Sequence, residues 1–173
     1  MKKLIAMLAA CCVSTAAQAQ EETISWKQLN EHWRMGMAQG MCMVETAYKS
    51  KLELTIRSFS TWKGFDLYMC HPDWRITEDK EYSARLYVDD GNYGPFKVKG
   101  ANQNCVYTDG YWGWQASLFK DLSNKKWWQF TINGKKISQK DMLLTGSKEA
   151  MWVLKQCSDR MSSESFPEQG DTF

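Results

Sequence analysis

The stretch that decides the fold is Met142–Cys157, which reads MLLTGSKEAMWVLKQC. It opens with an apolar run that stops at a Thr-Gly-Ser segment, and residues suited to a core then recur at Ala150, Met151, Leu154 and Cys157. This three- and four-residue spacing predicts an amphipathic helix preceded by a short buried strand. Ser147 is placed to cap the helix, because its hydroxyl can accept hydrogen bonds from the free amides of the first turn. We expect the helix to pack over the rest of the domain and to be tied to it through Cys157.

Residues 1–19 have the pattern of a secretory signal peptide. Lys2 and Lys3 form a basic start, an apolar run follows, and Ala17-Gln18-Ala19 supplies the small residues of a cleavage site. We expect cleavage near Ala19 and a periplasmic or secreted protein. A lipoprotein signal ending at Cys11 is the alternative, but cleavage there would leave too short an apolar segment. No second long apolar run follows in the sequence, so we expect no membrane span.

The net charge and the size of the chain limit the classes of protein and of partner that fit the sequence. The chain has 22 Lys and Arg against 20 Asp and Glu, and Lys2 and Lys3 belong to the leader, so the remaining chain is neutral. A neutral domain has no long-range field that attracts nucleic acid or anionic lipid, and we expect neither as a partner. About 150 residues remain, the size of one domain with an ordinary core. We assign this domain to residues 20–157 and expect the polar segment 158–173 to be disordered.

Four cysteines remain after the leader: Cys42, Cys70, Cys105 and Cys157. An even number in a secreted chain indicates a disulfide framework, and four cysteines allow three pairings. We favour Cys42–Cys157 and Cys70–Cys105, because the first joins the opening strand to the final helix and the second joins two mid-chain segments. A metal site that adds His71 to three of these cysteines is disfavoured, because no pair has the C-x-x-C spacing of structural zinc.

Alternating apolar and polar residues predict strands over most of the chain. Residues 52–56 and 65–69 alternate in this way, and we expect them to pair as a hairpin across Lys63-Gly64. A turn is predicted at residues 89–92, DDGN, and a two-residue hairpin at Asn133-Gly134.

Two segments suggest helix rather than strand. Residues 25–33 have helical spacing and a capping box from Ser25 to Gln28, which predicts a short N-terminal helix. Residues 114–124 have mixed periodicity and fit either a strand or a helical turn. The whole pattern predicts a mainly β protein, a single antiparallel β-sandwich or small barrel with a C-terminal helix.

The order of these features is shared with a known group of proteins. A cysteine opens a strand at Cys42, two strands lead to residues 71–76, HPDWRI, a strand ends at residues 88–91, VDDG, and the chain closes on residues 144–147, LTGS, and a helix. In this order the chain resembles small secreted bacterial proteins of the invasion-associated locus B type and related uncharacterised periplasmic proteins. The resemblance implies a β-sandwich-like fold, a periplasmic or surface location and no established catalytic activity. The chain departs from that pattern in its tryptophan content and in its two mid-chain cysteines.

An aromatic loop is the most suggestive surface feature. Residues 104–114, NCVYTDGYWGW, carry Tyr107, Tyr111, Trp112 and Trp114 among glycines and polar residues. Exposed rings of this kind stack on sugars or grip a peptide, while polar neighbours fix its orientation. The alternative is that Trp112 and Trp114 both point into the core, as their two-residue spacing allows, and aromatic clusters are more often core than site.

A second aromatic pair, Trp127 and Trp128, lies on a predicted strand, so the two side chains point to opposite faces. We expect one in the core and the other facing solvent, covered by the helix or in an interface, and we include Trp128 among the ligand-binding candidates. Lys125 and Lys126 precede the pair and could help to bind an acidic partner. We prefer the interpretation that these lysines protect an edge strand from aggregation.

The sequence contains no recognised catalytic motif, neither G-x-S-x-G nor H-E-x-x-H. His71 lies in a polar turn near Asp66 and Asp73, but a hydrolase also needs a nucleophile within reach, and the thiols are expected to be oxidised. Asp89 and its neighbours lack the spacing of a calcium loop. We therefore expect no catalytic residues, no metal and no cofactor.

Together these features predict a non-catalytic, exported binding domain that recognises an envelope protein or a glycan through the aromatic loop. The alternative is an immunity or inhibitor protein directed against a periplasmic toxin or a cell-wall hydrolase, since such proteins are also small, secreted and without catalytic motifs. A periplasmic enzyme that acts through His71 is a third hypothesis.

Overall fold

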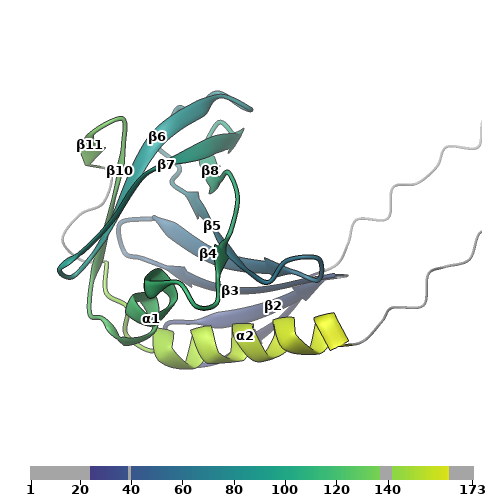
Figure 1. Ribbon diagram of the computed structural model, residues 1–173. Coiled ribbons are helices and arrows are strands. Elements are labelled where there is room, and N and C mark those ends of the chain that lie inside the picture. The colour runs from purple at the N-terminus through teal and green to yellow at the C-terminus, as the bar shows by residue number, and fades with distance from the viewer. Residues whose placement is uncertain (1–23, 39, 137–141, 164–173) are drawn as a thin grey trace, which may run out of the picture.

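The computed structural model describes residues 24–38, 40–136 and 142–163 (Figure 1). Ten strands form one antiparallel sheet in the order β1-β2-β3-β4-β5-β8-β7-β6-β10-β11, and the short strand β9 pairs with β5. The sheet is bent between its two halves but does not close into a barrel (Figure 1). The prediction of a mainly antiparallel β fold with a C-terminal helix is confirmed.

The first half of the sheet contains β1 (Ser25–Gln28), β2 (Arg34–Ala38), β3 (Met41–Ala47), β4 (Glu53–Phe59) and β5 (Gly64–Cys70). The second half contains β6 (Glu81–Val88), β7 (Gly91–Asn102), β8 (Cys105–Thr108), β10 (Trp128–Ile132) and β11 (Lys135–Lys136). The remaining elements are β9 (Trp112–Gly113), α1 (Ser117–Asn124) and α2 (Ser147–Ser163).

The predicted hairpins form where the local sequence dictates them. β4 and β5 pair antiparallel with Ile56 opposite Leu67, so the apolar members of both alternating runs face the same core. β6 and β7 meet across the predicted DDGN turn. Asn133 and Gly134 both have left-handed φ values, 48° and 74°, as the type I′ turn between β10 and β11 requires.

The C-terminal helix covers one face of the sheet. In Figure 1, α2 lies along β2 and β3, and it contacts β2, β3 and β4. Its buried side is formed by Ala150, Met151, Leu154 and Cys157, the residues that the spacing predicted. The strand predicted before the helix is reduced to one isolated bridge between Leu143 and Trp127, although Met142 and Leu144 are buried.

Both disulfides join the segments that the sequence favoured. Cys42 on β3 is bonded to Cys157 on α2, and Cys70 on β5 is bonded to Cys105 on β8. The two bonds suggest an oxidising compartment. In the part of the chain that the structure describes, no helix has the length and apolar character needed to cross a membrane.

The prediction of an N-terminal helix is wrong, because residues 25–28 form strand β1, which pairs with β2. The Asn30 side chain explains the turn between them. Its Oδ1 accepts hydrogen bonds from the backbone N–H groups of His32 and Trp33, each at 3.0 Å, and so reverses the chain. Trp33 is then fully buried and donates its indole N–H to the carbonyl of Thr145 at 2.9 Å.

The predicted end of the domain at Cys157 is also corrected, because α2 continues to Ser163. Ser158 and Met161 are buried against the sheet, and the Ser58 hydroxyl on β4 donates a hydrogen bond to the Ser158 hydroxyl at 2.9 Å. Buried contacts thus extend the helix into a segment whose composition is polar. The predicted signal peptide, residues 1–19, and the rest of the tail, residues 164–173, lie outside the described residues.

Candidate binding surface

The aromatic loop is anchored by its two tryptophans. Trp112 packs edge-on against Phe96, with ring centroids 5.2 Å apart, and Trp114 lies 5.6 Å from the Phe65 ring. Both tryptophans are partly buried against the core. The inward orientation that we considered for Trp112 and Trp114 is therefore the one that the structure has, and the pair positions the loop.

Tyr111 is the member of the loop that faces solvent, with 51% of its surface exposed. Its ring stacks on Trp62, at a centroid distance of 5.3 Å and an interplanar angle of 17°. Phe59 contacts the Trp62 ring edge-on at 4.4 Å. Tyr107 is separate from this group: it lies on β8, opposite Tyr68 on β5, and is partly buried.

The loop continues into helix α1 and supports a groove between the two helices. Trp114 contacts Phe119 edge-on at 5.3 Å, and Phe119 forms part of the groove wall. The groove has a volume of about 580 Å³, and its accessible wall is almost entirely apolar. We call it the α1–α2 groove; it is lined by Phe119, Ser123, Asn124, Gly146, Lys148, Glu149, Trp152 and Lys155.

The helices are held in place by their buried sides. Leu118 and Leu122 of α1 are buried, and the Tyr93 hydroxyl on β7 donates a 2.5 Å hydrogen bond to the Asp121 carboxylate. Trp152 lies off the buried side of α2, which is formed by Ala150, Met151, Leu154 and Cys157. Trp152 is 59% exposed, the largest exposed fraction among the described large hydrophobic side chains.

The rim of the groove carries charges of both signs. Glu149 accepts a hydrogen bond from the Asn30 side chain at 3.0 Å, which fixes the start of α2 against the β1–β2 turn. Lys155 forms a 2.6 Å ion pair with Asp159 one helical turn later. The charged groups therefore border an apolar strip, and they do not create a field of one sign.

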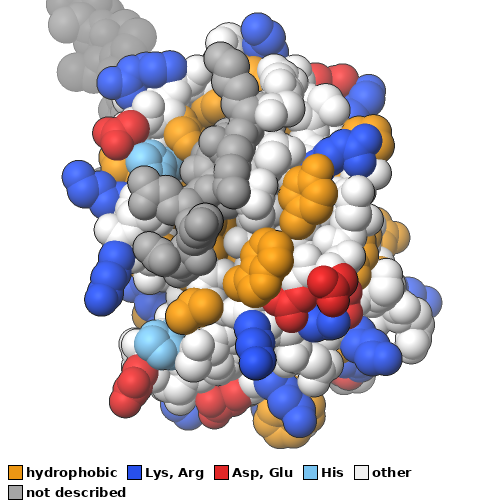
Figure 2. Space-filling model, turned by 90° about the vertical axis from the view of Figure 1, so that its left-hand side faces the viewer, with side chains coloured by type: hydrophobic (Ala, Val, Ile, Leu, Met, Phe, Trp, Pro, Cys, Tyr) orange, Lys and Arg blue, Asp and Glu red, His pale blue; other side chains and the backbone are white. Residues whose placement is uncertain are grey.

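Trp128 is not a surface residue, which corrects its place among the ligand-binding candidates. It is 1% exposed, and its indole N–H donates to the Tyr48 hydroxyl at 2.8 Å. Trp127 is the solvent-facing member of the pair, 41% exposed, and lies beside Leu143, which is 55% exposed. Figure 2 shows the face that lies at the left in Figure 1, where orange hydrophobic side chains lie near the centre with charged side chains around them.

The lysines that precede this pair do not protect an edge strand. β10 lies between β6 and β11, so the strand that follows Lys126 is an interior one. The backbone N–H of Lys126 is directed at the Asp89 carboxylate, 3.2 Å away, and the N–H of Trp127 donates to the same carboxylate at 3.0 Å. Asp89 thus fixes the entry to β10 from the β6–β7 turn.

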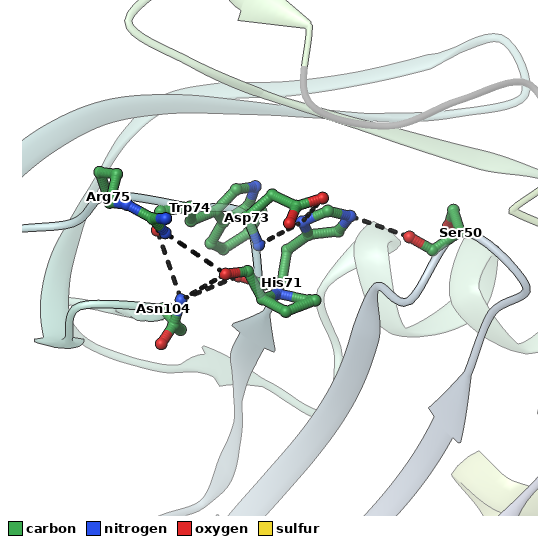
Figure 3. A network of polar contacts seen from close by, with 7 residues as sticks. Ser50, His71, Asp73, Trp74, Arg75 and Asn104 are labelled. Carbon is green, nitrogen blue, oxygen red and sulfur yellow. Dashed lines mark hydrogen bonds and ion pairs between the residues drawn. The ribbon is translucent and has the colours of Figure 1, made fainter.

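His71 is held in a turn by backbone groups on both sides of its ring (Figure 3). Its Nδ1 accepts from the backbone N–H of Asp73 at 3.2 Å, and Nε2 lies 2.8 Å from the carbonyl oxygen of Ser50. The Asn104 side chain donates to the carbonyl of Pro72 at 2.8 Å and so ties the turn to the β7–β8 connection. Both ring nitrogens therefore have backbone partners, and Nδ1 also lies 4.0 Å from the Asp73 carboxylate.

The cysteines of the disfavoured metal site are all in disulfides, Cys42 with Cys157 and Cys70 with Cys105, so none of them is a free thiol. Among the described residues, no group of three or more His, Cys, Asp or Glu side chains is arranged to hold a metal ion.

Sequence reasoning missed Trp152, Phe119 and Trp62. The signal for Trp152 was available, because a tryptophan between Met151 and Leu154 falls off the apolar stripe of the helix and must face solvent or a partner. Phe119 and Trp62 had no such signal, since their neighbours in space come from other parts of the chain.

The chain was compared with known proteins, and no family model, no curated protein and no solved structure matches it. The resemblance to proteins of the invasion-associated locus B type stays a prediction.

Proposed function

We propose that this protein is a non-catalytic binding domain of the bacterial periplasm, which holds an exposed apolar segment of another exported protein in the α1–α2 groove. The observation that carries the proposal is Trp152, whose ring is 59% exposed beside an apolar groove of about 580 Å³. A tryptophan in this setting loses little conformational freedom on binding and offers a large apolar area, which is why tryptophan is enriched at binding hot spots.

The chemistry of the groove favours a protein over a glycan. Sugar recognition needs polar groups that are placed to fix the hydroxyl groups, whereas the accessible surface of the groove is mainly apolar. Two of its polar side chains, Ser123 and Asn124, donate to carbonyls within α1. Glu149, the one carboxylate that lines the groove, already accepts a hydrogen bond from Asn30. The aromatic loop contributes indirectly, because Trp114 supports the Phe119 ring.

The test is a pull-down from periplasmic extract with the wild type and three variants. Trp152→Ala removes the exposed ring of the groove, and Trp127→Ala removes an exposed tryptophan outside it. Tyr111→Ala tests the exposed part of the aromatic loop. We expect Trp152→Ala to lose its partner while Trp127→Ala and Tyr111→Ala retain it, with unchanged circular dichroism for all three.

The bound protein is then purified and its affinity measured by calorimetry. Truncation of a hot-spot tryptophan costs about 2 kcal/mol or more, so Trp152→Ala should weaken binding by roughly 30-fold. Equal recovery of partners by Trp152→Ala and the wild type would refute the groove as the binding site. Recovery of glycan alone would refute a protein partner, and recovery of a toxin or cell-wall hydrolase would identify the domain as an immunity or inhibitor protein.

A further inference from the structure

The two disulfides occupy different surroundings. Cys42 is fully buried and Cys157 is 8% exposed, so their bond lies between α2 and the sheet. Cys70 is only partly buried and lines a pocket of about 460 Å³, while its partner Cys105 is 7% exposed. Cys70 is therefore the most exposed of the four disulfide-bonded residues.

The pocket beside Cys70 is lined in part by residues on the β4 side of β5, and by His71, Pro72 and Asn104 elsewhere. In the sheet, β5 runs between β4 and β8, with Glu53 opposite Cys70 on one side and Cys105 opposite it on the other. Ala47 and Glu53, both on the β4 side, line the pocket. A thiolate displaces one sulfur from another along the line of the S–S bond, so an approach over β4 is in line with Cys105 as the leaving group.

The structure around this disulfide does not depend on the bond to stay together. Cys70 and Cys105 are directly opposite in the β5–β8 ladder, and the next residue, His71, donates its backbone N–H to the Asn104 carbonyl at 2.9 Å. The Asn104 side chain adds a 2.8 Å hydrogen bond to the Pro72 carbonyl. We expect these strands to remain paired when the sulfur atoms separate.

We propose that Cys70–Cys105 is a thiol-exchange site. The thiolate of an incoming thiol bonds to the Cys70 sulfur, the S–S bond breaks, and Cys105 leaves as a thiolate that takes a proton from water. With a dithiol, the second thiolate attacks this mixed disulfide and releases Cys70, so the dithiol is oxidised to a disulfide and the protein gains two electrons as two thiols. The substrate class is a small-molecule thiol or a protein dithiol.

The experiment treats the native, oxidised protein with glutathione, a monothiol, and separately with reduced thioredoxin, a protein dithiol. Each reaction is quenched with iodoacetamide and the cysteines are mapped by mass spectrometry. We expect glutathione on Cys70 and alkylation on Cys105, at a rate at least about tenfold above that of Cys42–Cys157, whose exposure requires opening of the structure. Near-UV circular dichroism should stay native. Reduction by thioredoxin in addition would show that the pocket admits a protein dithiol.

The approach over β4 has its own test. Glu53→Gln removes a negative charge that repels the incoming thiolate, so exchange should become faster by roughly two- to threefold at low salt. Asp90→Asn removes an exposed carboxylate in the β6–β7 turn, at the far end of β7 from Cys105, and should leave the rate unchanged. Three results would each overturn the proposal: glutathione on Cys105, equal rates for the two disulfides, or reduction only with loss of the native near-UV spectrum. Equal exchange rates for Glu53→Gln and the wild type would overturn the direction of attack.

Discussion

Gly64 on β5 lies directly opposite Gly113 on β9, and the two glycines are not equivalent. A Cβ atom on Gly64 would lie 2.0 Å from the carbonyl oxygen of Trp112, whereas a Cβ on Gly113 would have its nearest neighbour, the Lys63 carbonyl, at 3.8 Å. The close backbone approach at Gly64 is what lets the aromatic loop dock on the sheet.

We expect Gly64→Ala to push β9 away from β5 and to reduce the free energy of unfolding by about 3 kcal/mol, because backbone atoms must move. Gly113→Ala is the matched control and should be neutral or stabilising by up to about 1 kcal/mol. Urea unfolding followed by circular dichroism gives both values. Similar losses in the two variants would show that the contact at Gly64 does not hold the loop.

Trp112 and Tyr111 have different roles in the aromatic loop, so replacing each with alanine should have unequal effects on stability. Trp112→Ala removes a ring that packs on Phe65 and Phe96 and should cost about 2–4 kcal/mol of stability. Tyr111→Ala removes an exposed ring that stacks on Trp62 and should cost about 1 kcal/mol or less. Thermal and urea unfolding measure both. A larger loss for Tyr111→Ala than for Trp112→Ala would contradict the assignment of Trp112 as the anchor.

Arg57 and Asp66 form a bidentate ion pair in which Asp66 is 1% exposed. Burial raises the pKa of the Asp66 carboxyl, and Arg57 opposes the increase. Arg57→Met leaves the carboxylate buried without its partner and should cost about 3 kcal/mol at pH 7, the lower end for a broken buried pair because Arg57 is partly exposed. Arg34→Met breaks the more exposed pair with Glu45 and should cost less than about 1 kcal/mol.

The cost of Arg57→Met should depend on pH. Without Arg57 the pKa of Asp66 in the folded state rises further above that of the unfolded chain, so the folded variant binds the proton more tightly. The free energy of unfolding that the variant loses relative to the wild type should therefore be smallest below about pH 4 and should grow as pH rises toward 7. Urea unfolding at several pH values tests this, and a cost that is independent of pH would contradict it.

Tyr48 and Trp128 make a different pH-dependent contact. Burial raises the pKa of the Tyr48 hydroxyl well above its usual range, and the hydrogen bond from Trp128 opposes the increase. Tyr48→Phe leaves the Trp128 N–H without its acceptor and should cost about 1–2 kcal/mol at pH 7.

At alkaline pH this difference should shrink. Tyr48 ionises in the unfolded chain above about pH 10 but stays protonated in the folded protein. Its contribution to the free energy of unfolding of the wild type therefore falls by roughly 0.8 kcal/mol by pH 10.5, and the variant has no such loss. Unfolding curves of both proteins at pH 7 and pH 10.5 give the comparison. A constant difference between them would show that Tyr48 titrates normally in the folded protein.

Local patterns in the sequence predicted the parts of the fold that depend on near neighbours. The alternation around Ile56 and Leu67 and the Asn133-Gly134 turn lead directly to the observed hairpins, because side-chain period and turn chemistry act within a few residues. The spacing of Trp26, Leu29 and Trp33 was misleading, because the Asn30 turn and pairing with β2 outweigh helical propensity there.

The surface was harder to predict than the fold. Sequence alone places Trp127 and Trp128 on opposite faces, but only the packing of the core against one face of the sheet decides which of them is buried. The α1–α2 groove depends on how closely two helices from distant segments approach, and this has no local pattern. The exposed Trp152 was the one feature of the groove that helical spacing could have indicated.

The Cys70–Cys105 bond lies inside the loop closed by Cys42–Cys157, and this nesting bears on how the protein is made. In the export that we propose, the chain crosses the membrane N-terminus first, so Cys42 arrives long before Cys157 and Cys70 is the next of the four thiols. Oxidation during transit should therefore produce a Cys42–Cys70 bond, which an isomerase must rearrange once α2 has emerged. We expect cells without that isomerase to accumulate the Cys42–Cys70 form, and equal yields of the native bonds in its presence and absence would show that oxidation waits for the whole chain.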